Sequence, residues 1–214
     1  MIQHLLQLIW NQRKQNAWLW AELLLVSVFL WFLVDYLYVM GRTYTAPLGF
    51  DIRHTYSIVI SSLSERSPDY IPKEKRERPD GVHLLTALDR IRTYPGVESA
   101  CLTDGGMPYY MGSRNLVWRI DTLQVPCRYA FVTPEFFDVF RIYDKDGKTA
   151  SLKRAIEDNN SIVISADVET MNPGLSLLGQ KAYRGNVTDE IEETIRGISV
   201  PIRRHEYTNG TQRL

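Results

Sequence analysis

The chain has 214 residues, and its 25 Lys and Arg balance its 25 Asp and Glu to a formal net charge of +0. This balance excludes the basic surplus of nucleic-acid-binding proteins and the acidic surplus of disordered chains, so we expect no nucleic acid partner. The first forty or so residues are apolar enough for a membrane. About 170 residues then remain, which is enough for one soluble domain with its own core.

Residues 1–16 have the pattern of an amphipathic helix. Apolar residues at the i, i+3, i+4, i+7 spacing of one helical face are Ile2, Leu5, Leu6 and Ile9. The segment ends with the basic pair Arg13 and Lys14. Such a helix lies on a membrane surface, and we place it on the cytoplasmic side.

Residues 17–40 predict one transmembrane helix. Twenty-four helical residues rise about 36 Å, against about 30 Å for the hydrocarbon core of a bilayer. A cleaved export signal has a shorter apolar region followed by small residues, and this run ends in DYLYVMGRTY instead. The basic pair before the span favours a cytoplasmic N-terminus, although Arg42 and Arg53 after the span weaken that orientation. We expect a permanent anchor in the lipid bilayer, with the remainder outside the cytoplasm.

Two carboxylates interrupt the apolar run. Between Glu22 and Asp35 lie about 18 Å of helix, so a bilayer core cannot exclude both charges. The two residues lie about 140° apart around the helix and do not share a face. Either both sit near the interfaces of a locally thinned bilayer, or Glu22 contacts a polar group on a transmembrane helix of another chain.

Residues 41–214 alternate between strand and helix patterns. The first half predicts a strand at 58–60, a charged loop over 64–81, a helix with Leu84, Leu85, Leu88 and Ile91 on one face, and a strand over 97–103. Pro95 and Gly96 end the helix.

The second half continues the alternation. It predicts a Gly-rich turn over 104–115, two short strands within 116–133, a helix that starts at Pro134, a strand and short helix over 160–174, and a last strand over 193–207. We predict an α+β fold, namely one N-terminal transmembrane helix followed by a mixed α/β domain outside the cytoplasm. In it the terminal strands pair with the first strand, and about 105–158 form an inserted β-rich lobe.

The sequence contains no recognisable catalytic, cofactor-binding or metal-binding motif. Phosphate loops, G-x-S-x-G elbows and H-E-x-x-H helices are absent from the sequence, and His4, His54, His83 and His205 lack metal-ligand spacing. We interpret Asp144–Gly147 (DKDG) as a turn rather than a calcium loop. Phe136, Phe137 and Phe140 share one face of a short helix and predict core packing, with an exposed partner surface as the alternative. We therefore expect no enzyme and no cofactor.

Two cysteines, Cys101 and Cys127, fall in predicted strands of the domain placed outside the cytoplasm. A disulfide between them is one interpretation, because that compartment is oxidising. Two buried free thiols are the other interpretation, and we favour it slightly.

Four short stretches, in order, resemble MacB/FtsX-type ABC transporter permeases. They are Tyr94–Ser99 (YPGVES), Val132–Phe140 (VTPEFFDVF), Ile162–Ser165 with Leu178–Lys181 (IVIS and LGQK), and Ile195–Ile198 (IRGI). The resemblance covers residues 45–200 and, with the N-terminal span, nearly the whole chain. It implies a MacB-like periplasmic core domain in the bacterial inner membrane. It also implies a separate cytoplasmic ABC ATPase subunit, and other permease subunits or a homodimer as partners, with no chemistry in this chain.

The chain departs from that family in two places. The stretch YDKDGKTASLKRAIEDNN replaces the family's L-x-x-G-R, and the three further spans of a four-span permease do not follow the domain. We therefore expect either a fragment of a longer permease or a truncated product. A single-span membrane sensor or scaffold protein, and an anchored extracytoplasmic enzyme, are the alternative classes. A sensor should carry a larger cytoplasmic module, and an enzyme should carry a cluster of convergent polar side chains.

Overall fold

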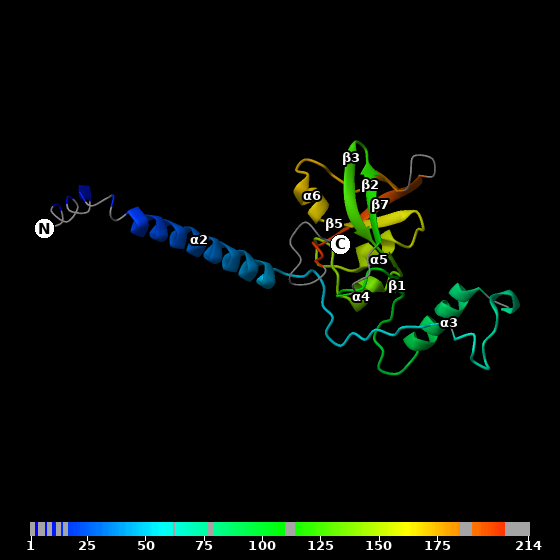
Figure 1. Ribbon diagram of the computed structural model, residues 1–214. Coiled ribbons are helices and arrows are strands. Elements are labelled where there is room, and N and C mark those ends of the chain that lie inside the picture. The colour runs from blue at the N-terminus through cyan, green and yellow to red at the C-terminus, as the bar shows by residue number, and fades with distance from the viewer. Residues whose placement is uncertain are drawn as a thin grey trace. The chain divides into compact units, whose positions relative to one another are not determined.

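A computed structural model of the protein describes residues 17–61, 63–76, 79–109, 114–184 and 190–203, the side chain of Lys73 apart, together with five single residues before the span: Gln3, Gln7, Trp10, Asn11 and Lys14. The predicted surface helix over 1–16, with Ile2, Leu5, Leu6 and Ile9, lies outside the described residues. The chain divides into two compact units, Met1–Ala46 and Pro47–Leu214 (Figure 1).

The first unit contains the long helix α2 (Ala17–Thr45, 29 residues). It begins where the sequence predicts and continues five residues beyond the expected end at Met40, because Gly41–Thr45 keep helical hydrogen bonding. The Thr45 hydroxyl donates to the carbonyl of Gly41 at 2.9 Å. Among the described residues, α2 is the one helix whose length and apolar composition suffice to cross a membrane. No side chain of α2 is buried, so its apolar surface is available to lipid or to other helices.

The predicted strand at Ile58–Ile60 is wrong. Residues 55–61 are extended but belong to no strand, and the Val59 side chain is 86% exposed. A run of β-branched residues favours a strand only when another strand supplies hydrogen-bond partners, and no described strand pairs with this segment. In the described residues between 64 and 79, the charged stretch after it contains the short 3-10 helix η1 (Lys73–Lys75) and no longer helix or strand, as expected of a solvated loop.

Helix α3 (Asp80–Arg92) confirms the helix predicted there. Thr93 caps its end by donating its backbone N–H to the carbonyl of Asp89 at 3.2 Å. Leu88 is buried, whereas Leu84 and Leu85 on the predicted apolar face are exposed. The strand expected at 97–103 is shorter than predicted and lies later in the sequence, because only Thr103 of that range falls in β1 (Thr103–Asp104). The described partner of β1 is the two-residue strand β4 (Phe131–Val132).

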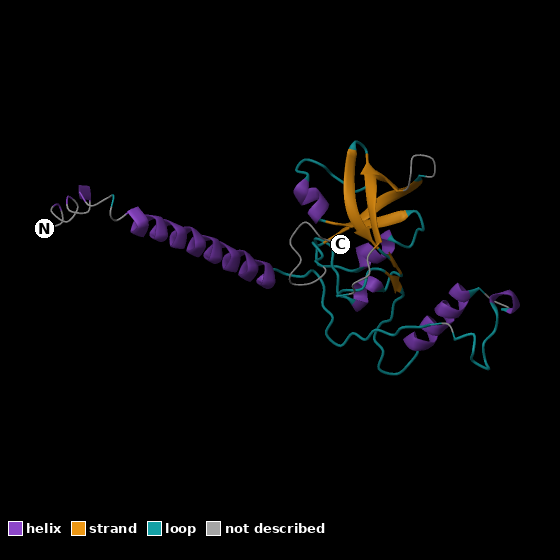
Figure 2. Ribbon diagram, viewed as in Figure 1, coloured by secondary structure: helices purple, strands orange, loops and turns teal. Residues whose placement is uncertain are grey.

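The main sheet has five strands in the order β3-β2-β6-β7-β5. Figure 2 shows the strands in orange. Its strands are β2 (Arg114–Ile120), β3 (Leu123–Tyr129), β5 (Ser161–Ser165), β6 (Lys181–Arg184) and β7 (Ile191–Ser199). All neighbours pair antiparallel except β5 and β7, which are parallel. The predicted strands within 116–133, at 160–165 and toward the end of the chain are therefore confirmed.

The hairpin β2–β3 lies inside the predicted inserted lobe of 105–158. Through the pairing of Arg119 with Tyr183 and of Ile120 with Ala182, β2 joins the same sheet as β6 and β7. This β-rich part of the chain is thus continuous with the sheet, and the bounds of a lobe stay a prediction. A mixed α/β domain follows an apolar N-terminal helix, which confirms the predicted α+β fold class.

Three short helices accompany the sheet, namely α4 (Phe136–Val139), α5 (Ala150–Ala155) and α6 (Asp167–Met171). Helix α5 packs against β5 and β7. The contact is close, because a Cβ added at Gly197 of β7 would lie 3.1 Å from Ala155 and 3.3 Å from the Leu152 side chain. A glycine in this strand therefore sets the distance between helix and sheet.

Two hydrophobic clusters form the core. The sheet cluster is made of residues from the strands, α6 and the loop before β6: Trp118, Ile120, Val125, Val168, Leu177, Ala182 and Ile195. The phenylalanine cluster lies around α4 and α5: Phe136, Phe137, Phe140, Ile142 and Leu152. Core packing of the three phenylalanines, predicted from their spacing, is confirmed, and the alternative of an exposed aromatic surface is wrong.

The family-like stretches occupy defined places in this domain. Tyr94–Ser99 follows α3, with the Val97 backbone N–H donating to Tyr94 at 3.1 Å, and Val132–Phe140 runs from β4 through α4. Ile162–Ser165 and Ile195–Ile198 are adjacent parallel strands, in which Ile162 pairs with Ile195 and Ile164 with Ile198. Two of the four stretches therefore form one structural unit.

Candidate functional site

The segment Pro47–Arg53, here called the joining segment, follows α2 and is fixed to the folded domain by main-chain hydrogen bonds. The Leu48 carbonyl accepts a hydrogen bond from the Arg203 backbone N–H at 2.8 Å. The Asp51 backbone N–H donates to the Phe140 carbonyl at 2.9 Å. Only Ala46 and Pro47 separate Thr45, the last residue of α2, from the first of these bonds. The chain therefore enters the core of the domain almost directly after the helix.

Gly49 permits the close approach that these bonds require. Its φ is +81°, a left-handed conformation that side chains disfavour. A Cβ built there would lie 2.0 Å from the carbonyl oxygen of Pro201. Both the backbone conformation and the space admit only glycine, so the joining segment lies directly against the chain that follows β7.

Phe50 anchors the joining segment by hydrophobic packing. Its side chain packs on the phenylalanine cluster, which also receives Ile202. Its ring makes an edge-to-face contact with the ring of Tyr109, with 5.9 Å between ring centroids. Such pairs add to the free energy of burial, so Phe50 contributes hydrophobic as well as hydrogen-bonded attachment.

Asp51 of the joining segment forms ion pairs with two arginines. Its carboxylate is 2.7 Å from the Arg53 guanidinium and 3.0 Å from that of Arg141. Hydrogen bonds from the Arg53 side chain, then from the Arg53 backbone N–H, hold the pKa of Asp51 well below its usual range. Arg53 itself is largely exposed, so water screens that pair. The Arg141 contact matters more for geometry, because it connects the joining segment to the second residue after α4.

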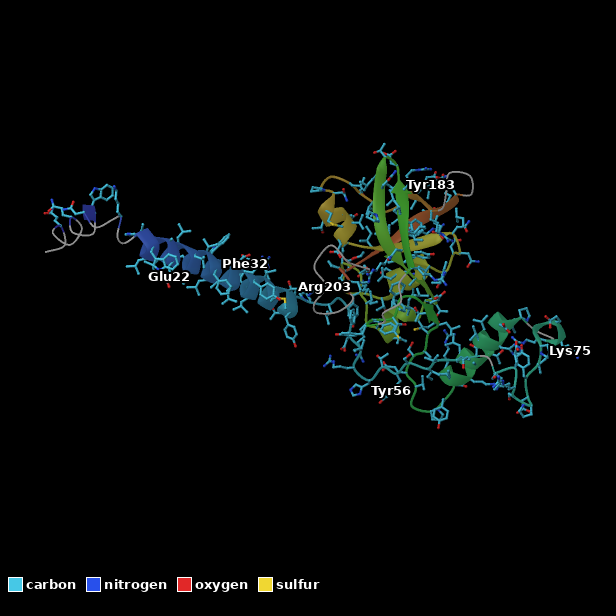
Figure 3. The ribbon with its side chains drawn as sticks, in the orientation of Figure 1. Glu22, Phe32, Tyr56, Lys75, Tyr183 and Arg203 are labelled. Carbon is cyan, nitrogen blue, oxygen red and sulfur yellow. The ribbon has the colours of Figure 1, made fainter. Side chains whose placement is uncertain are left out.

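Glu22 lies on α2, and its side chain is exposed (Figure 3). Asp35 is exposed on the same helix. The structure of one chain brings neither carboxylate to a partner helix. A contact between Glu22 and a transmembrane helix of another chain stays a prediction.

Cys101 and Cys127 are free thiols, each half-buried, and they pack in different clusters. Cys101 packs on the phenylalanine cluster and Cys127, in β3, on the sheet cluster. Burial raises the pKa of both thiols to about 11, with the Glu135 carboxylate adding to the effect at Cys101. A thiol with such a pKa is protonated and unreactive near neutral pH.

The stretch DKDG forms a turn, as predicted. The Asp144 carboxylate accepts hydrogen bonds from the backbone N–H groups of Asp146 at 2.9 Å and Lys148 at 2.8 Å, and from the Ser151 hydroxyl. These bonds, that of the Ser151 hydroxyl foremost, lower the pKa of Asp144. Across the described part of the chain, no three His, Cys, Asp or Glu side chains are grouped so as to hold a metal ion.

Sequence reasoning missed the joining segment. Its contacts link residues 48–51 with Phe140, Arg141 and Arg203, which are far apart in the sequence. The available signal is the stretch Pro47-Leu-Gly-Phe-Asp51 soon after the apolar run, in which Pro47 and Gly49 flank the apolar residue Leu48. That pattern indicates a turn, but it does not name the residues on which the turn packs.

No family model and no curated protein matches this sequence. Among solved structures, the chain is similar to a domain of a protein described as a permease from Porphyromonas gingivalis, at 21% identity and a TM-score of 0.42. It is also similar to the periplasmic region of MacB from Actinobacillus actinomycetemcomitans, at 10% identity and a TM-score of 0.41. The matches cover 55% and 54% of this chain and 45% and 50% of those chains. The chain thus spans about half the length of the solved structures that it matches.

Proposed function

We propose that the chain is the membrane-anchored periplasmic part of an ABC transporter permease. Helix α2 crosses the bacterial inner membrane, with the N-terminus in the cytoplasm and the α+β domain in the periplasm. The apolar length of α2 and the four family-like stretches support this proposal. The protein has no chemistry of its own in this role.

Its task is to transmit motion from a separate cytoplasmic ATPase to the periplasmic side, for export or mechanotransmission. The observation that carries this is the hydrogen bond between Leu48 and Arg203, three residues after α2 ends. A long flexible linker would dissipate a movement of the span, because such a chain behaves as a random coil. A short connection that is bonded into the core passes the movement on.

The partners of α2 are the lipid bilayer and the helices of other permease subunits or of a second copy. Glu22 supplies a contact with them, since a carboxylate at membrane depth is stable when it faces a protein interior rather than lipid. Asp35 serves as the matched comparison, because it is a second acid on the same helix.

The assembly is tested by purification of the tagged full chain from native membranes. We expect an ATP-hydrolysing subunit and further permease subunits to copurify, and Glu22→Gln to reduce their yield at least threefold, whereas Asp35→Asn leaves it unchanged. Repeated purification of the chain without any ATPase would contradict the proposal and is the result expected of a sensor or scaffold protein.

Transmission is tested by inserting ten Gly/Ser residues between Ala46 and Pro47 in the assembled complex. We expect ATP to change hydrogen exchange in the periplasmic domain of the native complex and to leave it unchanged after the insertion, with the ATPase still bound. The same insertion between Pro68 and Asp69, both exposed, is the control and should preserve the response. A full response after the first insertion would overturn transmission through the joining segment.

A further inference from the structure

A cavity of about 350 Å³ lies inside the domain. Its walls come from β2, β3, β5, β7 and α4, and residues of both hydrophobic clusters line it. Much of the lining is apolar, with Trp118, Val125, Cys127, Phe136, Ile162 and Val168 among the side chains. Its volume is within the range of small-molecule sites, and such sites combine an apolar wall with a few placed polar groups.

Glu193 of β7 is the first such polar group. Its side chain lines the cavity and is only 7% exposed. One carboxylate oxygen, Oε1, lies 3.3 Å from Nε of Arg184, also on the cavity wall. The other oxygen, Oε2, is buried and has no hydrogen-bond partner among the described residues. A buried carboxylate oxygen without a donor is costly, so a molecule that supplies one is stabilised there.

Ser161 of β5 is the second polar group on the cavity wall. Its hydroxyl oxygen is buried, lines the same cavity, and has no hydrogen-bond partner within the described ranges. Ser161 pairs with Thr194 in the parallel ladder of β5 and β7, which places it beside the residue that follows Glu193. Because successive side chains of a strand point to opposite faces of the sheet, Ser161 lies on the face of Thr194 and Glu193 on the other face. The two oxygens therefore belong to different parts of the cavity lining.

The charges around the carboxylate favour a neutral donor over a cation. Arg184 already balances Glu193, and its guanidinium carbon lies 5.6 Å from the centre of the Phe131 ring, which helps to hold it in place. Burial raises the pKa of Glu193, while Arg184 opposes that shift. An ammonium group would meet Arg184 and Arg128 on the same walls, whereas a hydroxyl or an amide N–H would not be repelled.

We propose that this cavity binds a small apolar molecule carrying a neutral hydrogen-bond donor, a hydroxyl or an amide N–H, which donates to Oε2 of Glu193. The apolar body lies against the Trp118, Val125 and Phe136 walls. Phe50 of the joining segment also lines this cavity, but the proposed binding does not rest on the proposed role in transport.

Calorimetry on the full chain in lipid nanodiscs tests the site, with empty nanodiscs as the blank. The probes are 4-phenylbutan-1-ol and its methyl ether, which share the apolar body but differ in the hydroxyl donor. We expect saturable one-to-one binding of the alcohol, about tenfold tighter than that of the ether, because a hydrogen bond to a buried charged acceptor is worth about that factor. Absence of saturable alcohol binding, or equal binding of both probes, would overturn the proposal and leave the two oxygens to water.

The matched variants are Glu193→Met and Glu192→Met. Glu192 is the preceding residue of β7 but is exposed and paired with Lys181 at 2.6 Å. We expect Glu193→Met to abolish the preference for the alcohol over the ether and Glu192→Met to retain it. Equal preferences in the two variants would contradict the role of Glu193.

Cysteine labelling tests the location without any substitution. Cys127 lines the cavity, whereas Cys101 is not among its lining residues and serves as an internal control in the same molecule. Saturating alcohol should slow alkylation of Cys127 at pH 9.5 at least fivefold and leave Cys101 unchanged, as read by mass spectrometry of the peptides. Unchanged alkylation of Cys127, or equal slowing of both thiols, would overturn binding in this cavity.

Discussion

The carboxylate of Asp51 lies 3.0 Å from the guanidinium of Arg141, which connects the joining segment after α2 to the chain just beyond α4. The main-chain bond from the Asp51 N–H to the Phe140 carbonyl runs beside it. Side-chain and main-chain contacts therefore attach the same two stretches of chain. The transmission of motion that we propose depends on this double attachment.

Asp51→Asn should loosen the joining segment without unfolding the domain. Loss of the charge removes attraction to Arg141 and Arg53, and we expect amide exchange at Asp51 and Arg203 to accelerate at least threefold. Asp104→Asn is the control, because Asp104 pairs with Arg114 at 2.6 Å elsewhere in the domain. Hydrogen exchange by mass spectrometry or NMR measures both, and equal acceleration in the two variants would contradict a local effect.

The ion pair between Asp51 and Arg53 predicts that the attachment of the joining segment depends on pH. The pKa of Asp51 is lowered in the folded protein by Arg53, so its stabilising contribution is present above the unfolded value of about 3.9. That contribution is lost as the pH falls below this value toward the folded pKa. Exchange at the Arg203 amide, corrected for its intrinsic pH dependence, should rise in the native protein below about pH 4. Asp51→Asn should show no such rise.

Gly49→Ala should destabilise the domain more than an ordinary substitution at a left-handed glycine. The backbone conformation alone costs about 1 to 2 kcal/mol, and the added methyl group also collides with the Pro201 carbonyl. Gly147→Ala is the control, because Gly147 has φ +75° but nothing within 4 Å of its Cβ position. Denaturant unfolding of both variants measures the difference. A loss at Gly49 no larger than at Gly147 would mean that the close approach is absent.

Val59→Thr should leave stability within about 0.5 kcal/mol, as expected for a surface substitution. Val125→Thr makes the same chemical change in the sheet cluster, where Val125 is buried, and should cost about 1 to 3 kcal/mol because the hydroxyl loses water. Denaturant unfolding distinguishes the two. A cost above about 1 kcal/mol at Val59 would show that residues 58–60 pair in a sheet after all.

Cys101 and Cys127 should react slowly in the folded protein. A pKa of about 11 in place of 9.0 lowers the thiolate fraction about a hundredfold at pH 8, so alkylation should slow by a similar factor relative to the denatured chain. Because the folded pKa is raised, the stabilising contribution is full below about pH 9 and is lost between pH 9 and 11. Failure to label either thiol in denaturant without a reductant would show a disulfide instead.

Local patterns decide the elements that form from their own residues. An apolar run of sufficient length predicts α2, periodic leucines with a following Pro-Gly predict α3, and short β-branched runs beside turn residues predict β5 and β7. The spacing of Phe136, Phe137 and Phe140 predicts their burial for the same reason. Helical hydrogen bonds join residues four apart, so the information that specifies them lies within the segment.

Local sequence patterns do not predict which distant stretches of the chain pair with one another; the tertiary structure shows these pairings. The run Ile58–Ile60 has the composition of a strand, but strand formation needs a partner, and none of the described strands pairs with it. The attachment of Leu48 to Arg203, the fit of Gly49 against Pro201 and the contact of Arg184 with Glu193 likewise depend on the tertiary structure. By itself, the sequence determined the long apolar helix and the α+β character of the domain, because hydrophobic length and periodicity are properties of continuous segments. Only the tertiary structure decided where the chain after that helix is held and where the cavity lies, because both are made by residues that folding alone brings together.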